Sequence, residues 1–139
     1  MQKEMVKYWL DLAQYDIETA DAMFATGRWL YVGFMCHQVL EKTLKAYWCS
    51  TQETPPPYIH NLKRLCDGVG LTEKLSDDQI EFVARMMPLN IEARYPEYKD
   101  ALLRTLSRDV CEGIIANTKE MALWIKNMCL ASSEDIETN

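Results

Sequence analysis

Residues 33–48 read GFMCHQVLEKTLKAYW, and this stretch decides how the rest of the chain is organised. Leu40, Leu44 and Tyr47 recur at helical spacing, and further apolar residues widen the surface around them. A helix that is apolar around most of its circumference is usually buried on most sides. The stretch therefore predicts a central helix, which we expect over about residues 29–50.

The same helix carries a row of polar side chains. His37, Glu41 and Lys45 follow one another at i, i+4 spacing, which places them on one face, and Lys42 lies one position round from Glu41. Charge left without a partner inside a protein is costly, so something must satisfy this row. One interpretation is a Glu41–Lys45 surface pair beside a partly buried histidine. The other is a row that binds a ligand.

Composition narrows the class of protein. At 139 residues the chain is long enough for one domain with its own core, which we place at residues 1–130, followed by a polar tail at residues 131–139. Hydrophobic residues make up 48% of the chain, which excludes a disordered protein. The net charge of -6 argues against a broad basic surface for a nucleic-acid backbone, although a local basic pocket remains possible.

The cysteines and the apolar runs indicate a cytoplasmic protein. Five cysteines without a CxxC pair favour neither a disulfide framework nor a zinc site, so we expect reduced and mostly buried thiols. No apolar run approaches transmembrane length, and residues 1–13, MQKEMVKYWLDLA, lack the apolar core of a signal peptide. We expect no metal and no cofactor, because phosphate-binding glycine loops and HExxH motifs are absent and histidines number only two.

Helical periodicity continues on both sides of the central helix. The first helix is expected over about residues 2–24, with Asp16 inside its apolar stripe. That carboxylate either faces a partner cation or lies at the edge of the stripe, and we expect the edge. The last helix is expected from about residue 100 to about Cys129. The pattern predicts an all-α fold, an up-and-down bundle of four main helices plus one short helix.

Local signals mark the ends of the shorter elements. After three successive prolines, Asn61 can cap a short helix that extends to about Val69. Ser76 and Gln79 have the pattern of a capping box that starts another helix, and Pro88 should kink or end that helix. His60 stands at the entrance of the short helix. It either makes a structural hydrogen bond there or belongs to a site, and we expect the structural role.

Four stretches, in order, resemble the HEPN domain family (higher eukaryotes and prokaryotes nucleotide-binding). They are LAQYDIETADAMFATGRW at residues 12–29, HQVLEKTLKA at 37–46, the HxLxxL pattern at 60–65 and Ala-Arg-Tyr-Pro at 93–96. The resemblance extends over about residues 8–128. It implies a HEPN-like helical bundle that binds a nucleotide or an RNA end, forms a homodimer and acts with a minimal nucleotidyltransferase in a toxin–antitoxin-like pair.

We also expect charged side chains of the second helix to converge with the Ala-Arg-Tyr-Pro element, because a residue before proline favours an extended backbone that can turn Arg94 back toward that helix. Arg94 and the lysines would offer donors to a phosphate, and Glu41 would orient one of them. No catalytic residue is expected. The predicted ligand-binding residues are His37, Glu41, Lys42, Lys45, Arg94 and Tyr95.

Two alternatives remain open. Ribonucleases of the HEPN family have an arginine followed four to six residues later by a histidine, near the start of the last helix. Here no histidine follows Arg94, and the only two are His37 and His60, so a metal-independent ribonuclease would have to use one of those. The second alternative is a purely structural homodimeric interaction protein whose polar row organises the interface.

Overall fold

The structure is all-α throughout the described residues. It is a computed structural model that describes the backbone of residues 2–90 and 96–138 and the side chains up to residue 131 within them. The prediction of an all-α helical bundle is confirmed. In chain order the elements are α1 (Gln2–Ala25), α2 (Trp29–Thr51), α3 (Leu62–Gly68), η1 (Thr72–Lys74), α4 (Asp77–Met86), η2 (Met87–Leu89), α5 (Pro96–Thr105) and α6 (Arg108–Thr138).

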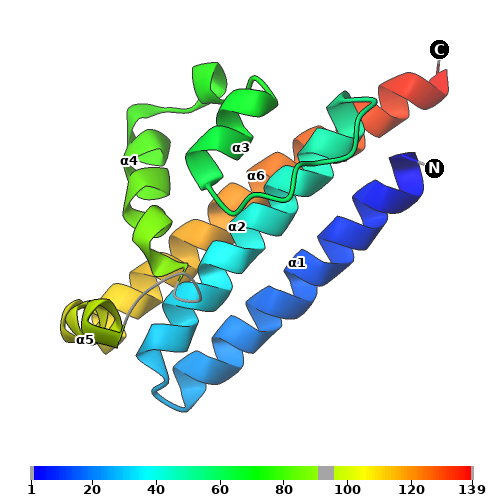
Figure 1. Cartoon of the computed structure of the whole chain (residues 1–139). Coiled ribbons are helices and arrows are strands. Elements are labelled where there is room, and N and C mark those ends of the chain that lie inside the picture. The colour runs from blue at the N-terminus through cyan, green and yellow to red at the C-terminus, as the bar shows by residue number, and fades with distance from the viewer. Residues whose placement is uncertain (1, 91–95, 139) are drawn as a thin grey trace.

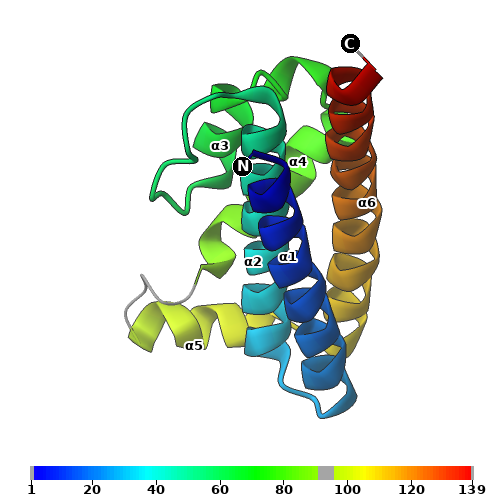
Figure 2. The ribbon, with the colours of Figure 1, turned by 90° about the vertical axis from the view of Figure 1, so that its right-hand side faces the viewer.

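Helix α2 is the centre of the bundle. It runs antiparallel to α1 and in the same direction as α6 (Figure 1). The shorter helices α3 and α4 lie on another side of α2. Seen from the side, α5 lies across the end of the bundle where α2 begins (Figure 2). Fourteen of the 23 residues of α2 are buried, as its apolar circumference predicts.

The predicted caps are present. The Asn61 side chain accepts a hydrogen bond from the backbone N–H of Arg64 at 3.0 Å and begins α3. Ser76 and Gln79 form the full capping box at the start of α4. Pro88 ends that helix, because α4 gives way to the η2 turn at Met87.

The last helix differs from the prediction. Instead of one helix from about residue 100, the chain forms α5 and α6 with a break at Leu106 and Ser107. The Ser107 side chain accepts a hydrogen bond from the backbone N–H of Val110 at 3.2 Å, which starts α6, while Leu106 is buried. A serine followed two residues later by an aspartate is the signal that could have located this boundary.

Helix α6 also extends further than predicted. Its backbone continues to Thr138, past the expected end at about Cys129. The polar residues of this segment include neither glycine nor proline, so nothing in them interrupts the helical hydrogen bonds. Within residues 2–90 and 96–138, no helix combines the length and the apolar content that crossing a membrane requires.

Candidate functional site

The polar row of α2 lies inside the protein. His37, Glu41 and Lys45 are 1%, 3% and 5% exposed. Lys45 Nζ donates to Glu41 Oε2 at 3.1 Å, so the expected pair exists, but it is buried and not on the surface. His37 Nδ1 lies 3.9 Å from Glu41 Oε1. Helical i, i+4 spacing explains why these three groups meet, and the packing around α2 explains why they are shielded from water.

A fourth member reaches the row from the connector between α2 and α3. His60 Nδ1 lies 3.0 Å from Glu41 Oε1 and 3.1 Å from Oε2. Its side chain is 61% exposed, whereas that of Glu41 is 4% exposed. We refer to His37, Glu41, Lys45 and His60 as the Glu41 cluster. His60 was expected to make a structural hydrogen bond at the entrance of the short helix. It does make a hydrogen bond, and the sequence had no way to show that its partner would be Glu41, 19 residues away.

Helix α1 closes the cluster on another side. The Nζ of Lys45 lies 5.4 Å from the centroid of the Trp9 ring, within the range of a cation–π interaction. Trp9 in turn makes an edge contact with Tyr8, at 5.6 Å between ring centroids. Lys45 is therefore held by a carboxylate and by the face of an indole, which compensates for part of its desolvation.

Lys42 does not join the Glu41 cluster. It forms an ion pair with Asp16 of α1, a carboxylate that is only 5% exposed. The expectation that Asp16 lies at the edge of its stripe is therefore wrong, and the alternative of a partner cation is correct. The reason is helical geometry, because one residue corresponds to a turn of about 100° and points Lys42 toward α1 and not toward Glu41.

The other two predicted site residues, Arg94 and Tyr95, lie outside the described residues. The last buried residue described before them is Leu89, whose Cδ1 lies 3.3 Å from the position that a Cβ on Gly33 would occupy. Gly33 precedes Glu41 by two helical turns, or about 12 Å along α2. The convergence of Arg94 with Glu41 and Lys45 stays a prediction.

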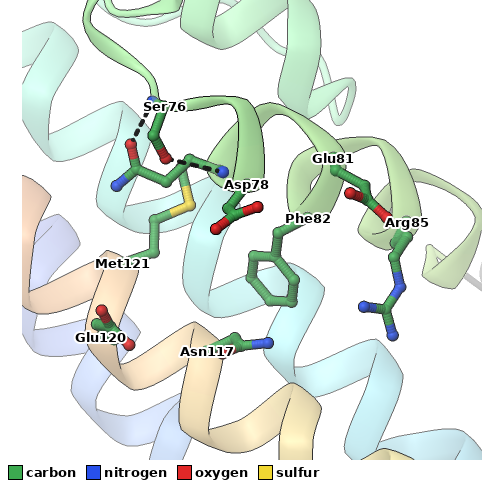
Figure 3. A pocket seen from close by; sticks show the side chains of 9 residues that line it. Ser76, Asp78, Glu81, Phe82, Arg85, Asn117, Glu120 and Met121 are labelled. Carbon is green, nitrogen blue, oxygen red and sulfur yellow. Dashed lines mark hydrogen bonds between the residues drawn. The ribbon is translucent and has the colours of Figure 1, made fainter.

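A separate hollow of about 420 Å³ lies between α4 and α6 (Figure 3). Asp78 and Phe82 project from α4 toward α6, from which Asn117, Glu120 and Met121 face them. The carboxylates of Asp78, Glu81 and Glu120 outnumber the single guanidinium of Arg85. Among these described lining residues the excess of negative charge disfavours a phosphate, and none of the four predicted site residues that the structure describes lines the hollow.

The cysteines offer no nucleophile. All five are free and buried. Burial raises the pKa of Cys36 and that of Cys66 to about 12, so both thiols stay protonated at neutral pH. Among the residues that the structure describes, no group of three or more His, Cys, Asp or Glu side chains could hold a metal ion.

The Glu41 cluster can orient one exposed imidazole. A buried carboxylate that engages Nδ1 fixes the tautomer and the ring orientation of His60, which leaves Nε2 for a ligand. When neutral, this Nε2 accepts a hydrogen bond; when the ring is protonated, Nε2–H donates to an anion such as a phosphate.

Comparison with known proteins agrees with this helical arrangement. The family model described as HEPN domain matches residues 6–128, which is most of the chain. No curated protein and no solved structure gives a significant match. The family match includes α2 with its polar row, His60 and the start of α6. The chain therefore belongs to the HEPN domain family.

Proposed function

We propose that this protein is a non-catalytic HEPN-type module that binds a nucleotide or an RNA end, and that the Glu41 cluster receives the terminal phosphate. The observation that carries the proposal is the bond between His60 and Glu41, in which a buried carboxylate holds an exposed ring. A ring oriented in advance loses little conformational freedom when it binds an anion, and a charge-assisted hydrogen bond is short and strong.

We propose a non-catalytic role because cleavage of RNA without a metal needs both a general base and a general acid. Of the two histidines, only His60 reaches solvent, whereas His37 is 1% exposed. No histidine follows Arg94 in the sequence. A ribonuclease remains the second candidate, because a histidine held by a carboxylate is also what a general base requires.

The membership of the HEPN family supports the remaining parts of the proposal. HEPN domains often dimerise, and we propose a homodimer. We further propose that it acts in the cytoplasm with a minimal nucleotidyltransferase, in a toxin–antitoxin-like pair. A pull-down from cells that express the tagged protein at its native level, with identification of the co-purified proteins, tests this partner.

Fluorescence anisotropy with a short single-stranded RNA tests the binding function. We expect the wild type to prefer a 5′-phosphorylated RNA over the same RNA with a 5′-hydroxyl. His60→Ala should abolish that preference by weakening the phosphorylated complex about 1.5–3 kcal/mol, the usual range for a charged hydrogen bond. The matched control is Lys7→Ala, which removes an exposed cation whose partner is Asp11.

Two outcomes would contradict the proposal. The first is a wild-type protein that binds neither RNA, and the second is a His60→Ala variant that keeps the preference for the phosphate. Gel analysis of the same RNA after incubation with the protein distinguishes a ribonuclease from a binding module. Shortening by the wild type that His60→Ala abolishes would establish a ribonuclease instead.

A further inference from the structure

A continuous line of contacts crosses α1 and α2 and has an exposed side chain at each end. Tyr8 contacts Trp9, and the Trp9 ring lies 5.4 Å from Lys45 Nζ. Lys45 in turn donates to Glu41, which His60 contacts from the other side. Tyr8 is 53% exposed and the His60 side chain 61% exposed, while Glu41 and Lys45 between them are buried and Trp9 is partly buried. The Glu41 cluster is therefore flanked by an open aromatic ring.

The aromatic end of this line belongs to a longer stripe on α1. Tyr15 follows Tyr8 by seven residues and is 70% exposed. That spacing places the two rings on the same face, about 10.5 Å apart along the helix. Leu10 and Gln14 lie on a different face of α1, because they line a hollow against α6. The tyrosines are thus turned away from the groove between α1 and α6.

The chemistry of this surface fits a strand that carries both flat rings and phosphates. Exposed aromatic side chains bind nucleobases by stacking, and any base can stack because each has a π-face. The edge contact with Trp9 restrains Tyr8 and leaves part of its ring open. Lys42 and Lys45 are already paired with Asp16 and Glu41, so a ligand gains little further charge attraction there and needs contact with its bases.

We propose that Tyr8 is a base-stacking residue for a single-stranded RNA end, with the terminal phosphate at His60. The inference rests on the proposed function and deepens it, since it names the class of ligand and a contact on α1. Two exposed rings on one helix face suit a strand with successive bases better than a single nucleotide. A second protein copy over the same stripe is the competing occupant, and the test below distinguishes it.

The experiment is a thermodynamic cycle between the protein and the RNA. A 5′-phosphorylated single-stranded RNA is compared with the same RNA whose first three nucleotides are abasic, using wild type, Tyr8→Phe and Tyr8→Ala. We expect Tyr8→Ala to weaken the intact RNA about tenfold, and Tyr8→Phe to bind as the wild type does. The abasic RNA should bind the wild type and Tyr8→Ala equally, because the stacking partner is absent from it.

Controls separate the failure of this inference from that of the proposed function. Ile80→Ala removes a comparably exposed apolar side chain from α4, and should leave both RNAs unaffected. Equal weakening of both RNAs by Tyr8→Ala would overturn base stacking, since the change would then act through the phosphate end. Unchanged RNA binding together with a shift in sedimentation would instead assign the stripe to a protein interface. After either of these two results, the proposed function still stands if His60→Ala loses the preference for the phosphorylated RNA.

Discussion

His60 Nδ1 lies 3.0 Å from Oε1 of Glu41, which joins an exposed ring on the connector to a buried carboxylate on the central helix. Besides orienting the imidazole, this contact ties the proline-containing connector to α2. The same carboxylate also accepts the hydrogen bond of Lys45. Glu41 therefore has a structural role besides the binding role proposed for its cluster, so the stability of each variant in this cluster has to be measured alongside its binding.

The Glu41–Lys45 pair should show strong coupling in stability. Removing one partner of a buried ion pair leaves a charge without compensation, so Glu41→Leu and Lys45→Met should each lower the free energy of unfolding by about 3–5 kcal/mol. The double variant should be less destabilised than the sum of the two, because no buried charge remains. Urea denaturation of the four proteins measures this coupling. Additive effects would contradict it.

Two glycines should respond to alanine in opposite directions. A Cβ at Gly68 would lie 2.5 Å from Cζ3 of Trp48, whose ring is held by the hydrogen bond from its Nε1 to Thr54 O. Gly68→Ala should therefore cost about 1–3 kcal/mol of stability. A Cβ at Gly113 meets no atom within 4 Å, so Gly113→Ala should stabilise α6 by about 0.5–1 kcal/mol.

Thermal denaturation of these two variants provides the measurement. In a Trp48→Leu background the collision at Gly68 is removed, and Gly68→Ala should then no longer destabilise the protein. Persistent destabilisation in that background would mean that the backbone, and not the indole ring, requires glycine at this position.

Arg94→Ala tests the site residue predicted from the sequence. We expect binding of the 5′-phosphorylated RNA to weaken by about 1.5–3 kcal/mol while the unfolding midpoint changes less, because a donor to the phosphate is lost. Anisotropy and denaturation on the same preparation measure both quantities. If the variant unfolds while its remaining folded fraction binds normally, Arg94 is a structural ion-pair partner.

The buried thiols should make stability fall at alkaline pH. Burial raises the pKa of Cys36 from 9.0 to about 12. Above pH 9 the unfolded chain therefore loses a proton that the folded protein keeps, so the free energy of unfolding decreases as pH rises from about 9 toward 12. Cys36→Ala should show a smaller decrease in urea denaturation between pH 8 and pH 10. An identical pH dependence in both proteins would refute this assignment.

A homodimer is predicted from the apolar excess of the second and last helices. Since most of α2 is buried, the exposed apolar surface of the last helix is the better candidate, with Leu123 and Leu130 57% and 44% exposed. Leu123→Glu should weaken the dimer, because it places a charge in an apolar contact. Analytical ultracentrifugation at micromolar concentration measures the oligomeric state of both proteins. A wild type that sediments only as a 16.2 kDa species rejects the prediction.

The features that the sequence determined by itself are those that depend on near neighbours. The Ser76–Gln79 capping box, the Asn61 cap and the Glu41–Lys45 pair each join residues three or four positions apart. Helical geometry is the same wherever the helix is placed, so these contacts follow from spacing alone. The apolar circumference of α2 likewise predicted its central position. Ser107 was a comparable local signal that the interpretation of one long last helix overlooked.

The tertiary structure alone decided which separate segments meet. Asp16 lies 26 residues from Lys42, and Glu41 lies 19 residues from His60, yet each pair is in contact. Spacing along the chain says that a carboxylate needs a partner, but not which one, because the partner depends on how α1, α2 and the connector pack together. The same packing buried the Glu41–Lys45 pair and left Tyr8 and His60 open, since burial is a property of the assembled bundle and not of any one helix.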